Sequence, residues 1–140
     1  MKTTVGLPKL KGLDVSALSE QHHQKGDYKS RLLLEARLRW EEFQDDQALD
    51  MYAEVATLEE ELMQECRDAG VGPKYFIHAF SAAHCWIKAA DFYRARHLCK
   101  TILEQPDLTP PLREKAEALL QGVREGQQAS WEKLNPKLAA

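Results

Sequence analysis

A long stripe of apolar residues with helical spacing, in the middle of the chain, most constrains what this sequence can fold into. At 3.6 residues per turn these residues line one face of a helix for about six turns. They are Ala48, Met51, Tyr52, Val55, Leu58, Leu62, Cys66 and Ala69. Asp45 or Asp46 can cap the start of this helix, and Gly70 suits the position just past its end. A helix with one long apolar face needs other helices to cover it.

Three further amphipathic segments supply those partners. We predict a helix over residues 30–43, with Asp27 as its N-cap. Apolar residues cover much of its circumference, so it needs neighbouring helices on more than one side. A third helix starts near Pro73, and a last one follows Thr109 and Pro110. Their apolar positions are Leu33, Leu34, Ala36, Leu38, Trp40 and Phe43; Phe76, Ala79, Phe80, Ala83, Trp86 and Ile87; and Leu112, Ala116, Leu119, Leu120 and Val123.

Length and composition agree with an all-α chain of one domain. The 140 residues are enough to bury a hydrophobic core, and Ala, Leu, Glu, Lys, Gln and Arg dominate the sequence. We predict a loosely ordered N-terminal arm over residues 1–26, with a short docked helix as the alternative. A helical domain follows over residues 27–126, and a polar C-terminal tail over residues 127–140.

The charge is spread unevenly. Residues 31–70 hold four arginines against twelve acidic residues, whereas the segments before and after are weakly basic. No concentrated basic stripe is present, which argues against nucleic-acid binding. The acidic run from Glu59 to Glu61 is most simply a solvated helix face.

Cysteine use and hydropathy indicate an intracellular protein. Cys66, Cys85 and Cys99 are odd in number and lie in apolar helical contexts, which predicts buried free thiols and a reducing cytoplasm. The N-terminal segment lacks the apolar run of a signal peptide, and no stretch approaches the 18 or so apolar residues of a membrane span. We expect neither a membrane nor a nucleic acid among the partners.

Residues 87 to 106, IKAADFYRARHLCKTILEQP, decide how the later helices are arranged. Ala89 and Ala90 stand where a turn would favour glycine, so propensity alone favours one long helix. In one straight helix, Phe92 would lie about 120° around the axis from Trp86, and the apolar stripe would break. A turn with Asp91 as the N-cap of a second helix brings both stripes to one core. We therefore predict two paired helices.

The residues around this turn resemble a tetratricopeptide repeat, a helix pair of about 34 residues. The matching positions are Ala79, Ala82, Ala83 and Trp86 in the first helix, Ala90-Asp91-Phe92 at the turn, and Ala95 and Pro106 in and after the second. The sequence departs from the family pattern at Ala90, which replaces the usual glycine, and at Cys99 and Ile102. Upstream, only Ala36, Ala48 and Tyr52 match. The resemblance covers about residues 29 to 125 and implies antiparallel helix hairpins, about five helices in all. A plain up-down helical bundle is the alternative.

The resemblance also implies a ligand groove, and so a non-enzymatic protein–protein interaction module that acts as a scaffold or adaptor. Carried over by position, the groove residues are Leu33, Arg37, Trp40, Ile77, Phe80, His84, Ile87 and Lys88. A shallow apolar groove edged by Arg37 and Lys88 suits an extended or helical segment with acidic groups. The competing interpretation places Leu33, Trp40 and Phe80 in the core. The module acts alone or as a homodimer; two repeat-like units bury less than the usual three, and self-association could supply the missing interface.

The sequence gives no strong signal for a metal, a cofactor or catalysis. Five histidines are present, but no HxxxH or CxxC spacing occurs, and a zinc site needs three or four converging ligands. No glycine-rich phosphate loop or nucleophile elbow appears. We expect no metal, no cofactor and no catalytic residue. A helical bundle with a small-molecule or metal-assisted activity is the alternative.

Overall fold

The described part of the chain, residues 18–139 of a computed structural model, is helical throughout apart from short connections. Its helices are α1 (Glu20–Phe43), α2 (Asp46–Asp68), α3 (Gly72–Lys88), α4 (Phe92–Leu103), α5 (Pro110–Leu134) and the one-turn α6 (Pro136–Ala139). The prediction of an all-α chain built from antiparallel helix hairpins, with about five helices, is confirmed.

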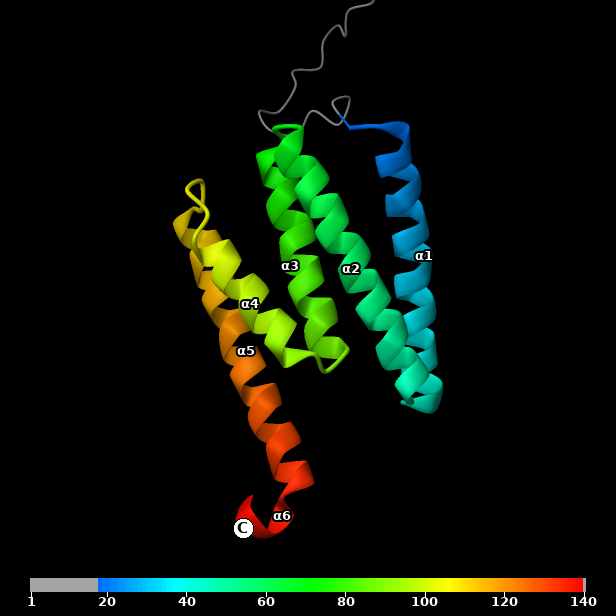
Figure 1. Ribbon diagram of the computed structural model, residues 1–140, viewed down its shortest axis with the longest axis vertical. Coiled ribbons are helices and arrows are strands. Elements are labelled where there is room, and N and C mark those ends of the chain that lie inside the picture. Colours follow the sequence, from blue (N-terminus) through cyan, green and yellow to red (C-terminus); the bar gives the residue numbers. More distant parts are fainter. Residues whose placement is uncertain (1–17, 140) are drawn as a thin grey trace, which may run out of the picture.

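The helices α2 and α3 form the centre of the molecule (Figure 1). On one side α1 packs along α2, and on the other side α4 and α5 pack against α3 and against each other. Most of the buried apolar side chains come from α2 and α3, which share the core with Leu32 and Ala36 of α1, Ala95, Leu98, Cys99 and Ile102 of α4, and Ala116, Leu119 and Val123 of α5. The long stripe on α2 therefore faces other helices, as its spacing predicts.

The turns at both ends of α3 have the same geometry. After α2, Gly70 has a φ of 76°, and the N–H groups of Gly70 and Val71 donate to the carbonyls of Arg67 and Cys66. After α3, Ala90 has a φ of 61°, and the N–H groups of Ala90 and Asp91 donate to the carbonyls of Ile87 and Trp86. Both are Schellman turns, in which a left-handed residue ends the helix.

The predicted break after Ala90 is therefore confirmed. Asp91 caps α4, because its carboxylate accepts a hydrogen bond from the backbone N–H of Arg94 at 3.1 Å. The other predicted start signals also hold at Asp45, whose carboxylate accepts from the N–H of Ala48, and at Pro73 in the first turn of α3. Thr109 takes the N-cap position of α5, although its hydroxyl makes no capping hydrogen bond.

The prediction that Asp27 caps the first helix is wrong. The N-cap lies eight residues earlier, at Ser19, whose hydroxyl accepts the capping hydrogen bond from the N–H of His22 at 3.0 Å, and α1 begins at Glu20. Contacts with α2 hold this early part in place despite Gly26, because Lys25 pairs with Glu65 at 2.5 Å. Tertiary contacts here outweigh a helix-breaking residue. The first seventeen residues of the expected arm lie outside the described residues.

The C-terminal end also differs from the expected polar tail. The helix α5 continues through residues 127–134, and Figure 1 shows this end extending past the helices of the body. Trp131 is 44 % exposed and Leu134 is 81 % exposed, so neither side chain ties the segment to the core. Within the described residues, none of these helices is both long enough and apolar enough to cross a membrane.

Candidate functional site

A hollow of about 310 Å³ opens between α1 and α3, with α2 as its floor. Its lining residues are Leu33 and Arg37 of α1, Tyr52 of α2, and Ser81, His84, Cys85 and Lys88 of α3. We call this hollow the basic groove. None of its lining residues is acidic, and its exposed rim carries Arg37 and Lys88. The groove therefore combines an apolar and aromatic floor with cationic edges.

Positive charge continues from the basic groove toward α5. Lys115 of α5 lies with its Nζ 4.8 Å from the ring centroid of Phe80 on α3, a cation–π arrangement. Partial burial lowers the pKa of His84, and the nearby charges of Lys115 and Lys88 lower it further. The two lysines therefore disfavour a further cation beside His84. The same field favours an anionic group.

Four of the eight groove residues predicted from the family resemblance line the basic groove. They are Leu33, Arg37, His84 and Lys88. The structure does not place the other four in its lining. Phe80 is only 4 % exposed and belongs to the core, while Trp40 and Ile87 are half-buried against that core. Ile77 is exposed, at 58 %.

Three residues of the groove were missed because the sequence gives them another role. Tyr52 belongs to the apolar stripe of α2, and only the approach of α1 to α3 turns its ring into a groove floor. Ser81 and Cys85 are four residues apart, and Lys88 follows three residues later. That spacing puts the three on one strip of a helix, so a helical projection of α3 could have found Ser81 and Cys85.

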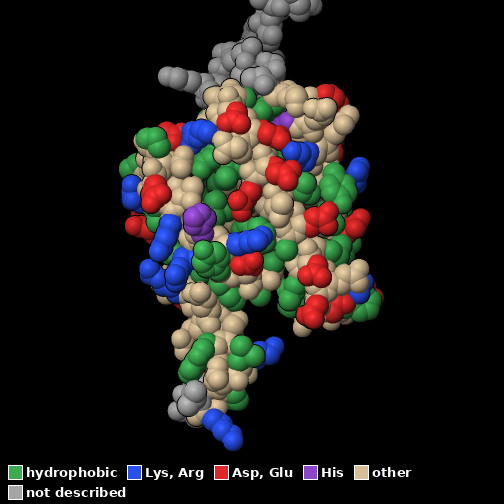
Figure 2. Space-filling model, viewed as in Figure 1, with side chains coloured by type: hydrophobic (Ala, Val, Ile, Leu, Met, Phe, Trp, Pro, Cys, Tyr) green, Lys and Arg blue, Asp and Glu red, His purple; other side chains and the backbone are tan. Residues whose placement is uncertain are grey.

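A larger hollow of about 640 Å³ lies between α2 and α4, over the end of α3. The indole N–H of Trp86 there donates to Glu60 at 2.6 Å, and the guanidinium of Arg94 lies 5.0 Å from the Trp86 ring. Acidic and basic side chains occur together in its lining, so it offers no single charge to a partner. In the space-filling view, charged side chains of both signs are likewise interspersed over the face shown (Figure 2).

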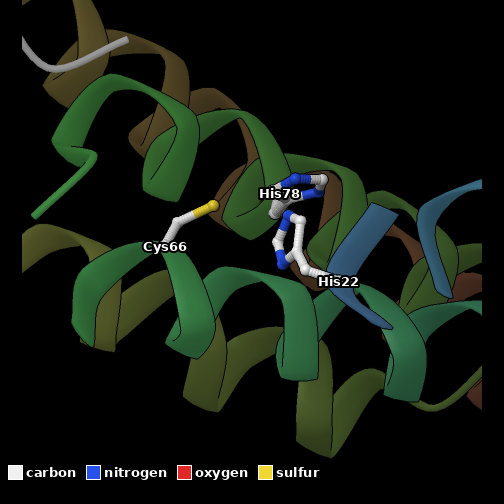
Figure 3. A group of neighbouring side chains, drawn as sticks. All are labelled: His22, Cys66 and His78. Atoms are coloured by element: carbon white, nitrogen blue, oxygen red, sulfur yellow. The ribbon is translucent and has the colours of Figure 1, made fainter. Parts of the chain in front are cut away.

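A separate cluster of three buried side chains joins α1, α2 and α3. One ring nitrogen of His22, one of His78 and the Sγ of Cys66 all lie within 4.8 Å of one another. Figure 3 shows the sulfur of Cys66 pointing toward the two imidazole rings. These three residues could together hold a metal ion, a possibility that the sequence did not indicate. Helical spacing could not reveal it, since each ligand comes from a different helix.

The carboxylates beside this cluster correct another prediction. Glu59 does not lie on a solvated face, because it is only 1 % exposed and accepts a hydrogen bond from His78 Nδ1 at 2.7 Å. Lys29 approaches its other oxygen at 3.3 Å. Glu65 accepts from His22 Nδ1 at 2.7 Å, so each imidazole has its own carboxylate. His22 and Glu65 thus tie α1 to α2, and His78 and Glu59 tie α3 to α2.

The three cysteines are free and buried, as predicted. Burial raises the pKa of Cys85 and of Cys99 to about 11, and it raises the pKa of Cys66 as well. Their thiols are therefore protonated at neutral pH and poor nucleophiles. None of the three is prepared for covalent catalysis.

The fold and the basic groove define the class of this protein as an all-helical hairpin bundle with a cationic surface groove. No family model, curated protein or solved structure gives a significant match to the chain. Its function is therefore inferred from its own residues.

Proposed function

We propose that this chain is a non-enzymatic protein-interaction module of the tetratricopeptide-like type, which binds an acidic segment of another protein in the basic groove. One observation carries the proposal: Leu33, Arg37, His84 and Lys88, which the family resemblance assigns to a ligand groove, line one hollow with no acidic residue in its lining. Such a groove supplies both apolar contact and charge pairing to a peptide.

The groove chemistry favours a partner segment that alternates acidic and apolar side chains. Leu33 and the ring of Tyr52 offer apolar surface, while Arg37 and Lys88 are exposed at the rim, where they can pair with carboxylates. Desolvation is the main cause of the lowered pKa of His84, and the charges of Lys115 and Lys88, which add to it, favour an anionic ligand. Rim charges mainly set the association rate and selectivity, so binding should weaken as salt rises.

Self-association through α1 is the second part of the proposal. The outer face of α1 leaves Leu34, Leu38 and Phe43 between 54 % and 56 % exposed. The first two are four residues apart and so lie side by side on the helix. A second copy of the chain could cover this strip. Light scattering should then give twice the monomer mass, and Leu34→Glu with Leu38→Glu should restore the monomer mass. A strict monomer at high concentration would refute this part.

We place this module in the cytoplasm. Cys66, Cys85 and Cys99 are all free and buried, which suits a reducing compartment. Fractionation of cells that express the tagged chain would test the location, and recovery in the membrane or secreted fraction would contradict it.

Binding to a peptide array tests the groove. The array carries segments of alternating Leu and Glu beside matched segments of alternating Leu and Lys. The wild-type chain should bind the acidic set, and Arg37→Glu with Lys88→Glu should weaken that binding by about tenfold or more, since two favourable charge pairs become repulsive.

The matched control reverses two charges elsewhere. Arg96 and Lys100 are exposed on α4 and line neither hollow described above. Arg96→Glu with Lys100→Glu changes the net charge by the same amount and should leave acidic-peptide binding unchanged. Equal losses in the two double variants would show that net charge, rather than the basic groove, attracts the peptides.

A further inference from the structure

The cluster of His22, Cys66 and His78 contains an unsatisfied polar atom. The Nε2 atom of His78 is buried and has no hydrogen-bond partner among the described residues. A buried nitrogen without a partner costs about 1–3 kcal/mol, so a native structure that keeps one calls for a physical explanation. His22 and Cys66 are also buried, at 5 % and 0 % exposed, and they converge on the same place (Figure 3).

The two carboxylates favour one tautomer of each ring. An ionised carboxylate can only accept a hydrogen bond, so Nδ1–H of His22 donates to Glu65 and Nδ1–H of His78 donates to Glu59. In a neutral imidazole the other nitrogen, Nε2, then carries a free lone pair. Metal-binding histidines in proteins almost always have this arrangement, with the second nitrogen held by a carboxylate or carbonyl.

The carboxylates are themselves anchored. Glu65 pairs with Lys25 at 2.5 Å, and Glu59 lies 3.3 Å from the Nζ of Lys29. Both rings are thus held in place by two layers of contacts from α1 and α2. A site prepared in this way loses little side-chain freedom when an ion binds.

The type and spacing of the ligands indicate zinc. Two imidazoles and a thiolate form a common ligand set of Zn²⁺, and the thiolate disfavours Mg²⁺ and Ca²⁺. A tetrahedral zinc ion with bonds of about 2.0–2.3 Å holds its ligand atoms about 3.5 Å apart. The three donor atoms here lie within 4.8 Å of one another, so small side-chain rotations would close the set.

A way in from the surface is present at His22. A hollow of about 320 Å³ beside the cluster is lined by Leu18, Ser19, His22, Glu65, Asp68 and Ala69. It reaches His22 from the surface, where an ion and a water molecule could approach. Three protein ligands with one position left for water or another ligand is the pattern of an accessible zinc site.

We propose that His22, Cys66 and His78 form a zinc-binding site, with Glu65 and Glu59 as positioning residues that orient the two imidazoles. Binding replaces the thiol proton of Cys66, which is released to solvent, by a zinc–sulfur bond. The ion then links α1 to α2 and α3 at the end of the molecule where the described chain begins. The inference is independent of the basic groove, because the two sites share no residue.

Metal titration of the full chain tests the site. The purified protein is stripped with a chelator under reducing conditions and titrated with Zn²⁺ by calorimetry, and with Co²⁺ by absorption spectroscopy. We expect one equivalent of each metal. The Co²⁺ form should show a thiolate-to-cobalt charge-transfer band and the intense visible bands of tetrahedral cobalt. Cys66→Ser should remove the charge-transfer band.

Variants at neighbouring positions separate the site from general histidine binding. His22→Gln should lower the Zn²⁺ affinity by about a hundredfold, because it removes one of three protein ligands. His23→Gln, at an exposed position one residue away, should leave the affinity unchanged. Glu65→Gln should lower the affinity by about 10–100-fold, as loss of a partner that orients a ligand does elsewhere. Circular dichroism checks that each variant keeps its helices.

Three results would overturn the proposal. They are zinc binding well below one equivalent by wild-type protein, a Co²⁺ complex without a thiolate band, and equal affinity losses in His22→Gln and His23→Gln. If His22→Gln loses its helical signal, Glu65→Gln decides instead, and unchanged zinc affinity in that variant would count against the site.

Discussion

Replacing Ala90 by glycine should stabilise the protein. The residue has a φ of 61°, a left-handed conformation that costs a residue with a Cβ atom about 1–2 kcal/mol. Glycine removes this cost but adds about 0.4–1 kcal/mol of freedom to the unfolded chain. Ala90 is exposed, so no buried contact is lost. The net gain should be about 0.5–1 kcal/mol, or roughly 2–5 °C in Tm.

Gly70 supplies a control of opposite sign within the same molecule. It ends α2 in the same kind of turn with a φ of 76°, and a Cβ atom there would meet nothing within 4 Å. Gly70→Ala should therefore destabilise the protein by about 0.5–1 kcal/mol through backbone strain alone. The pair thus isolates one physical effect in both directions.

Urea unfolding followed by far-ultraviolet circular dichroism measures both changes. The midpoints should move in opposite directions while the slope of the unfolding free energy with urea stays constant, because neither change alters the surface exposed on unfolding. If Ala90→Gly leaves the midpoint unchanged or lowers it, the left-handed turn after α3 is not the conformation that limits stability there. A continuous helix through residues 86–98 would give that result, since glycine would then weaken a helix interior.

Two further predictions concern α5 and the loop before it. A Cβ atom on Gly126 would overlap the ring of Phe92, whose Cζ would lie only 2.9 Å away, whereas one on Gly122 would meet nothing within 4 Å. Gly122→Ala should therefore raise the unfolding free energy by about 1 kcal/mol, and Gly126→Ala should lower it by about 1 kcal/mol. Equal effects of the two substitutions would refute the close approach of Phe92 to Gly126. Hydrogen bonds from Arg67 lower the pKa of Asp107. The pair therefore stabilises the fold above about pH 4, and this stabilisation is lost as the pH falls through the lowered pKa of Asp107. Asp107→Asn should lose about 0.5 kcal/mol at neutral pH, as an exposed pair does, and should match wild type in acid; a constant difference at all pH values would contradict this.

Several features of the fold could be predicted from the sequence because local rules set them. The Asp45 and Asp91 caps, the glycine after α2 and the proline that opens α3 each act within one turn of their own position. Predicting the break after Ala90 needed one further step, a comparison of the rotational phase of the apolar stripes before and after it. That step succeeded because a broken stripe costs burial, and burial outweighs the helix propensity of alanine.

The groove was only partly predictable. Arg37 and Lys88 line the basic groove because they lie on the outward strips of helices whose rotational phase the apolar pattern indicates. Phe80 was assigned to the groove as well, but α5 packs over it and buries it. The position of α5 depends on the loop before it, and helical periodicity carries no information about that loop.

The sequence by itself determined the helices, most of their ends and the pairing of α3 with α4, because apolar periodicity and helix capping depend on residues close together in the sequence. Only the tertiary structure decided where α1 starts, that Glu59 is buried, and that His22, Cys66 and His78 meet. Those three residues are separated by 44 and 12 positions and come from three helices. Their meeting depends on the angle and register at which helices pack, which the whole core sets together and no local stretch encodes.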